Sequence, residues 1–176
     1  MITYEFAVLL GGVALLIYIA SALFFKLSKS KIILGGVFIV YLTAVFAITL
    51  FPILLDEKIE YFGDITWYNF IPFKTVISMM SGGLNATAVI QILGNICLTV
   101  PLGIFSMIFL KKHKWYKFLA LGLLFAVSIE VLQLVIGLVI DNMYRTVDID
   151  DVILNLTGFF IGCKIYKILP TCIKSL

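Results

Sequence analysis

The chain has few charged residues, one histidine and three cysteines, and these shortages exclude several classes of protein. Charged residues make up 13% of the 176 residues, whereas hydrophobic residues make up 62%, and the mean hydropathy is +1.16. A soluble domain is nearer half apolar. The composition therefore predicts an integral membrane protein, with a single membrane domain over residues 1–176 and no soluble module.

The scarce histidine and cysteine leave little room for metal, triad or disulfide chemistry. His113 lies among lysines with no second ligand nearby. Cys97, Cys163 and Cys172 form no C-x-x-C pair, so a disulfide framework is not expected. No Walker loop or nucleophile elbow is present, and we expect no cofactor.

Five apolar segments are each long enough to cross a membrane. A helix of about 20 residues spans about 30 Å of hydrocarbon. The segments are approximately residues 4–25, 32–55, 88–110, 118–140 and 149–169. The predicted fold class is therefore an all-α polytopic membrane protein with five transmembrane helices.

Lysines and acids alternate between the ends of these segments. Lysines follow the first, third and fifth segments, whereas the other connections hold most of the acids. Because positively charged loops stay in the cytoplasm, the N-terminus is predicted outside and the C-terminus in the cytoplasm. The net charge of +3 follows from this membrane topology and does not indicate nucleic-acid binding.

The longest loop, about residues 56–87, is then external. It begins with four acids, Asp56, Glu57, Glu60 and Asp64, and continues as the aromatic stretch 67–73. Tyrosine and tryptophan favour the headgroup layer. We predict a short interfacial helix over residues 72–81, ended by Gly82 and Gly83, that serves as an aromatic anchor or as a lid.

Glu130 is the most informative single residue, because it lies about 15 Å deep in the fourth segment. A carboxyl at that depth costs several kcal/mol, about 2.5 or more by insertion scales, and commonly marks a functional site. Gln133 follows at i+3 on the same helix face.

The fifth segment carries a polar and glycine stripe on one face. Its members are Asp148, Asp151, Asn155, Gly158 and Gly162, and the glycines of its inner half would allow close contact with another helix. Asn155 and Asn95 of the third segment are both about 10 Å below the outer boundary. We therefore expect a shared outer-half pocket with Arg145 at its mouth.

Other roles remain open for these residues. Asp148, Asp150 and Asp151 could cap a helix N-terminus, and the asparagines could form interhelical hydrogen bonds. Arg145 could neutralise Asp148 or pair with lipid phosphate. A less favoured alternative is a Mg²⁺ or Ca²⁺ site made by oxygen ligands. Its ligands would be Glu130, Asp148, Asp151 and Asn155.

Together these residues resemble the VanZ-like family, which is named after an accessory protein of glycopeptide-resistance clusters. The matching pattern is Asn69-x-x-Pro72-Phe73, Asn95, Pro101-x-Gly103, Glu130-x-x-Gln133 and Arg145-x-x-Asp148-x-x-Asp151-x-x-x-Asn155-x-x-Gly158-x-x-x-Gly162. The resemblance covers about residues 69–162 within a core of about 41–169. It implies a bacterial cytoplasmic-membrane protein and, for the first member, low-level resistance to the lipoglycopeptide teicoplanin.

Two functional hypotheses follow. In the first, the pocket binds a lipid-linked or lipidated molecule without catalysis; the partner is a membrane lipid, a lipid-linked cell-wall precursor or a lipoglycopeptide. In the second, the chain is an enzyme that modifies a lipid or envelope component, with Glu130 or Asp151 as general base and Arg145 holding an anionic group. The candidate binding residues are Asn69, Asn95, Glu130, Gln133, Arg145, Asp148, Asp151 and Asn155.

Overall fold

The computed structural model describes residues 1–53, 55, 67–81, 86–110 and 114–169. Their helices fall into two compact units, and each unit is described by itself. Four features of the sequence lie outside the described residues: the acidic start of the long loop, Gly82–Gly83, His113 and Cys172.

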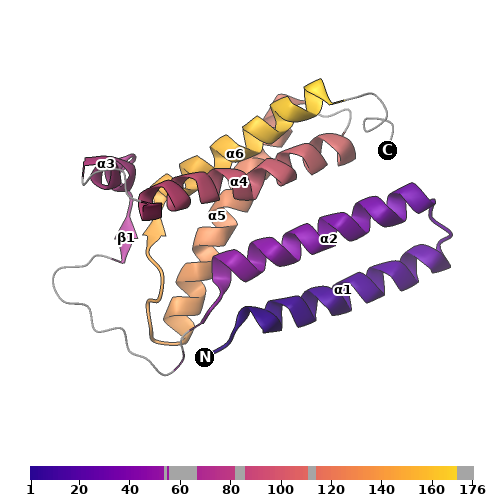
Figure 1. Cartoon of the computed structure of the whole chain (residues 1–176), viewed down its shortest axis with the longest axis horizontal. Coiled ribbons are helices and arrows are strands. Elements are labelled where there is room, and N and C mark those ends of the chain that lie inside the picture. Colours follow the sequence, from indigo (N-terminus) through magenta and orange to yellow (C-terminus); the bar gives the residue numbers. More distant parts are fainter. Residues whose placement is uncertain (54, 56–66, 82–85, 111–113, 170–176) are drawn as a thin grey trace. The chain divides into compact units, whose positions relative to one another are not determined.

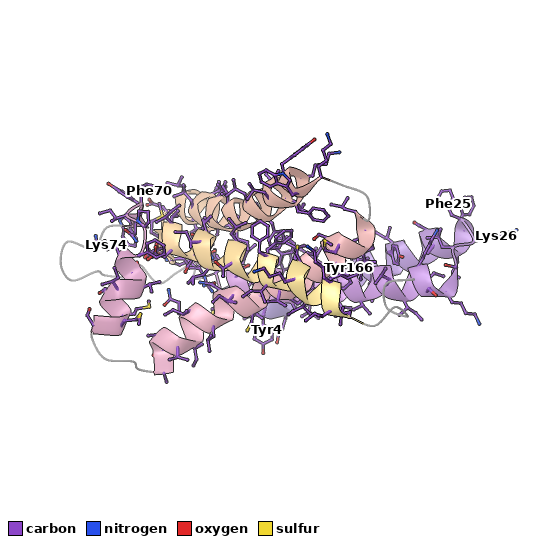
Figure 2. The ribbon with its side chains drawn as sticks, turned by 90° about the horizontal axis from the view of Figure 1, so that it is seen from above. Tyr4, Phe25, Lys26, Phe70, Lys74 and Tyr166 are labelled. Carbon is purple, nitrogen blue, oxygen red and sulfur yellow. The ribbon has the colours of Figure 1, made fainter. Side chains whose placement is uncertain are left out.

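The first unit is a hairpin of two helices, α1 (Tyr4–Phe24) and α2 (Lys29–Leu50). A bridge between Ile2 and Ile53 joins its open end. Figure 2 shows Phe25 and Lys26 at the turn, at the opposite end of α1 from Tyr4. Helix α2 ends five residues earlier than the sequence predicted, because Pro52 disfavours helical geometry in the residue before it.

The second unit holds three long helices and the segments that connect them (Figure 1). Helix α4 (Ala86–Phe109) lies along α6 (Ile149–Ile168), and α5 (Trp115–Val139) packs against α6. The short helix α3 (Lys74–Ser81) contacts both α4 and α6. Two short strands, β1 (Tyr68–Asn69) and β2 (Val147–Asp148), pair in parallel with Asn69 opposite Asp148.

Glycines bring the backbones of α4 and α6 into direct contact. A Cβ added to Gly158 would come within 2.0 Å of the Ile96 carbonyl oxygen, and one added to Gly162 within 2.0 Å of the Val100 oxygen. Gly103 of α4 meets the Phe159 oxygen in the same way. Small residues permit this approach, as the stripe on the fifth segment predicted.

Helix α5 carries its polar side chains inside and its apolar side chains outside. Glu130 and Gln133 are buried on the same face as three small residues, Gly122, Ala126 and Gly137. Exposed leucines and valines lie on the other faces, among them Leu124, Val131 and Leu138 at 48–69% exposure. A helix surrounded by water would show the reverse pattern, so this distribution fits a lipid environment.

Four described helices are long and apolar enough to cross a membrane: α1, α2, α4 and α5. The protein is therefore an all-α, multi-pass membrane protein in class. Helix α6 has 20 residues, enough for about 30 Å, but it also carries Asp150, Asp151, Lys164 and Lys167. The fifth span remains a prediction, as does the interfacial position of α3.

Widening the α4–α6 contact should destabilise the protein. We expect Gly158→Ala to lower the thermal midpoint in detergent, because a methyl group there collides with backbone and overpacking costs about 1–3 kcal/mol. The matched control is Gly94→Ala in α4, where a Cβ meets nothing within 4 Å. Equal midpoints for the two variants would contradict this account of the helix contact.

Candidate functional site

Polar side chains from five elements and the loop before β2 gather at the N-terminal end of α6. We call this group the polar cluster. Its members are Asn69, Gln91, Asn95, Thr99, Glu130, Arg145, Asp148, Asp150, Asp151 and Asn155. Glu130, Asp148, Asp150 and Asn155 are each at most 5% exposed. The cluster is therefore largely internal to the second unit.

Asp148 is the junction between β1, α5 and α6. Its backbone N–H donates to the Glu130 carboxyl at 3.0 Å, which fixes β2 against α5. Its own carboxyl accepts from the Asn69 amide at 2.9 Å and from the Asp150 N–H at 2.9 Å. Asp148 thus caps α6, as the sequence allowed, and also holds β1 in register.

Asp150 holds α3. Its carboxyl accepts hydrogen bonds from the backbone N–H groups of Phe73, Thr75 and Val76, the last two at 2.9 and 3.1 Å. Hydrogen bonds to charged groups contribute about 1.5–3 kcal/mol each. The bulky Phe73 has φ = 65°, an unusual left-handed conformation. A side chain of α6 therefore fixes the start of α3.

The sequence reasoning missed this role of Asp150, which it considered only as a possible cap of its own helix. One signal was available. Phe73, the residue before α3, has no side-chain acceptor, so a helix that begins there needs an acceptor from elsewhere. Nothing in the local sequence shows that the acceptor comes from a residue 77 positions away.

Hydrogen bonds connect α4 to α6 at two levels along the helices. In the first, the Asn95 amide donates to the Asp151 carboxyl at 2.5 Å, and Gln91 also bonds to that carboxyl. In the second, one turn deeper, the Thr99 hydroxyl donates to the Asn155 carbonyl oxygen at 2.5 Å. The Asn155 side-chain oxygen is buried without a hydrogen-bond partner among the described residues.

Arg145 supplies the positive charge of the polar cluster. It precedes β2 and is close enough to act electrostatically on both Glu130 and Asp151. These two carboxyls also act on each other. Glu130 and Asp151 thus share one guanidinium, and Asp148 acts electrostatically on both carboxyls, while the N–H groups at the start of α3 engage Asp150.

The structure brings together seven of the eight residues predicted for the site: Asn69, Asn95, Glu130, Arg145, Asp148, Asp151 and Asn155. The eighth, Gln133, is buried on the Glu130 face of α5. Their roles in binding or catalysis remain predictions. Among the described residues, no group of three or more His, Cys, Asp or Glu is arranged to hold a metal ion, and the metal alternative stays a prediction.

Comparison with known families agrees with the resemblance seen in the sequence. The family model described as VanZ/LLP1 matches residues 38–170, about three-quarters of the chain. The chain belongs to the VanZ/LLP1 family. Comparisons with curated proteins and with solved structures give no match.

The polar residues and the glycines that carried the VanZ-like resemblance have two different structural roles in this chain. The polar positions, from Asn69 to Asn155, lie in the polar cluster or on its buried faces. The glycines, Gly103, Gly158 and Gly162, form the contact between α4 and α6. The pattern therefore combines a close helix pair with the polar group at its end.

Loss of the Asp150 carboxylate should release α3. We expect Asp150→Asn to speed amide hydrogen exchange at Phe73, Thr75 and Val76 by about tenfold or more, because one carboxamide oxygen replaces a charged two-oxygen acceptor. The matched control is Asp141→Asn, at an exposed aspartate after α5. Unchanged exchange in Asp150→Asn would contradict the role assigned to this residue.

Proposed function

We propose that this VanZ/LLP1 protein binds the polar part of a lipid-linked or lipidated molecule in the outer leaflet of the bacterial cytoplasmic membrane. Binding would occur at the polar cluster, in the outer half of a protein with five spans. It would support low-level tolerance of lipoglycopeptides such as teicoplanin, or maintenance of the cell envelope. The observation that carries the proposal is the buried Glu130 carboxyl within an apolar helix.

Placing the Glu130 carboxyl deep within an apolar helix costs free energy. It is nine residues from the end of α5 at Val139, about 14 Å along the helix. Its hydrogen bond to the Asp148 N–H could be made by a glutamine, which would avoid a carboxyl in the membrane. Structural support alone therefore does not account for the carboxyl. Interaction with a ligand gives a reason for the cost.

The lipid-linked class of ligand is favoured by the surface beside the polar cluster. Apolar side chains on β1, α3 and the residues between them are 54–66% exposed: Tyr68, Phe70, Ile71, Phe73, Ile77 and Met80. Figure 2 shows Phe70 and Lys74 together at this end of the unit. Such a surface suits the boundary between headgroups and acyl chains, where a lipidated molecule would present its polar part.

An enzymatic role is the second candidate. It is favoured by the closeness of Arg145 to Glu130 and Asp151, which pairs a possible general base with a cation that could hold a phosphate or carboxylate. The reaction would modify a lipid or envelope component. Acid–base chemistry fails completely without the carboxyl of Glu130, whereas binding also uses other groups of the polar cluster and is only weakened by its loss.

The teicoplanin susceptibility of bacteria that rely on this protein for protection should distinguish the binding role from the enzymatic role. We expect Glu130→Ala to reduce the minimal inhibitory concentration of teicoplanin to that of cells lacking the protein. We expect Glu130→Gln to retain part of the protection, since its amide oxygen can still accept from the Asp148 N–H and the carboxyl of Asp151 is unchanged. The matched control is Val131→Ala, at an exposed neighbour on α5.

Expression of each variant is checked by immunoblotting, and a glycopeptide without an acyl chain tests the lipid requirement. Wild-type protection by Glu130→Ala would remove this residue from the site. Loss of protection in Glu130→Gln equal to that in Arg145→Ala would favour the enzyme. Equal protection against both glycopeptides would contradict a lipidated ligand.

The proposed orientation has its own test. In a background without the native cysteines, we expect an impermeant thiol reagent added outside cells to label Ser81→Cys at the end of α3. It should leave Lys114→Cys, just before α5, unlabelled until the cells are opened. Labelling of Lys114→Cys in intact cells would reverse the topology and place the polar cluster in the inner leaflet.

A further inference from the structure

Asn155 poses a problem that the helix contact does not explain. It is 1% exposed, yet its side-chain oxygen has no hydrogen-bond partner among the described residues. An asparagine that served only to join helices would use this oxygen across the contact. Here the backbone carbonyl of Asn155 accepts the hydrogen bond from Thr99 instead. The side-chain oxygen is an unused acceptor in the protein interior.

This acceptor lies next to the carboxyls of the polar cluster. Asn155 follows Asp151 by four residues, so the two side chains occupy the same face of α6 on successive turns. Asp151 is in turn within electrostatic reach of Glu130, Asp148 and Arg145. A group that reached the Asn155 oxygen from the end of α6 would therefore pass the carboxyls.

The charge at this place is unbalanced. Among the described residues, Arg145 is the one cation that acts on the carboxyls of Glu130 and Asp151, whose negative neighbours include Asp148. Buried carboxylates need a counter-charge or a proton. The amide donors nearby already have acceptors, since Asn69 bonds to Asp148 and Asn95 to Asp151. What this arrangement lacks is a positively charged group with several hydrogens to donate.

We propose that the polar cluster binds a primary ammonium group of an amphiphilic molecule, with the Asn155 oxygen as one acceptor and the carboxyls of Glu130 and Asp151 as counter-charges. A primary ammonium carries three donors and one positive charge. It thus matches both the unused acceptor and the surplus of carboxyls. This inference rests on the proposed function and names the chemical class of its ligand.

Two kinds of amphiphile supply this group. One is a phosphoethanolamine headgroup, whose phosphate would lie near Arg145; the other is a lipidated molecule with a free amine. The probes are phosphatidylethanolamine, phosphatidylcholine and phosphatidylglycerol with identical acyl chains, together with a long-chain primary amine. Phosphatidylcholine has a cationic headgroup without an N–H donor, and phosphatidylglycerol has hydroxyl donors without a cation.

The experiment measures binding of each probe to the delipidated full-length protein by native mass spectrometry. We expect phosphatidylethanolamine to bind at least about tenfold more tightly than phosphatidylcholine. Such a difference corresponds to about 1.4 kcal/mol of additional binding free energy. Binding of the long-chain amine as well would assign recognition to the ammonium alone. Binding of phosphatidylethanolamine but not of the long-chain amine would assign recognition to the whole headgroup. Either result supports the proposal.

Variants of Asn155 separate recognition from folding. We expect Asn155→Leu, similar in shape but without an acceptor, to lose the preference for phosphatidylethanolamine. Its thermal midpoint without lipid should be unchanged or higher, because an unpaired buried oxygen is removed. Asn155→Asp keeps the acceptor and should keep the preference. Val131→Ala, at an exposed site on α5, is the control for nonspecific effects.

Several results would overturn the inference. Equal binding of phosphatidylethanolamine and phosphatidylcholine, or stronger binding of phosphatidylglycerol, would exclude an ammonium as the recognised group but leave the proposed function intact. An unchanged preference in Asn155→Leu would mean that a buried water meets this oxygen. Failure of every probe to bind, combined with wild-type drug susceptibility in Glu130→Ala, would overturn the proposed function as well.

Discussion

The first turn of α6 connects almost every other element of the second unit. The backbone N–H of Asp148 binds Glu130 on α5, and its carboxyl binds Asn69 on β1. The Asp150 carboxyl holds the start of α3, and Asp151 bonds to Asn95 on α4. One short segment therefore determines where four other elements meet. Its carboxyls are divided among these tasks, because each points in a different direction around the helix.

The glycine contact between α4 and α6 makes this arrangement possible. The 2.0 Å spacing between built Cβ positions and the opposite carbonyl oxygens shows that no larger residue fits there. With the backbones so close, the Asn95–Asp151 and Thr99–Asn155 bonds form directly between the helices. The same closeness buries Asn155 almost completely. The helix contact and the polar cluster thus depend on each other, since a larger separation of α4 and α6 would break both interhelical hydrogen bonds.

Much of the architecture could be predicted from apolar length and helical spacing. The limits of α1 and α6 agree within one residue with the expected segments, because the apolar run of α1 ends before Lys26, whereas α6 begins after its Asp148 cap and ends before Pro170. Depth and face also predicted that Glu130 and Gln133 would be buried together. The predicted end of α2 was wrong by five residues, because the prediction followed hydropathy and did not take Pro52 into account. The metal alternative stays a prediction; in the structure, neighbouring amides and N–H groups engage these carboxyls separately.

The sequence by itself determined the membrane class, the family and the side chains that face the interior, since these follow from hydropathy, spacing and local motifs. Only the tertiary structure decided the partner of each carboxyl. Asp148, Asp150 and Asp151 are alike in composition and almost adjacent, so no local rule distinguishes a cap of its own helix from a clamp on α3 or a bond to α4. That choice depends on contacts between residues 56 to 79 positions apart, and the packing of α4 against α6 determines which of these contacts can form.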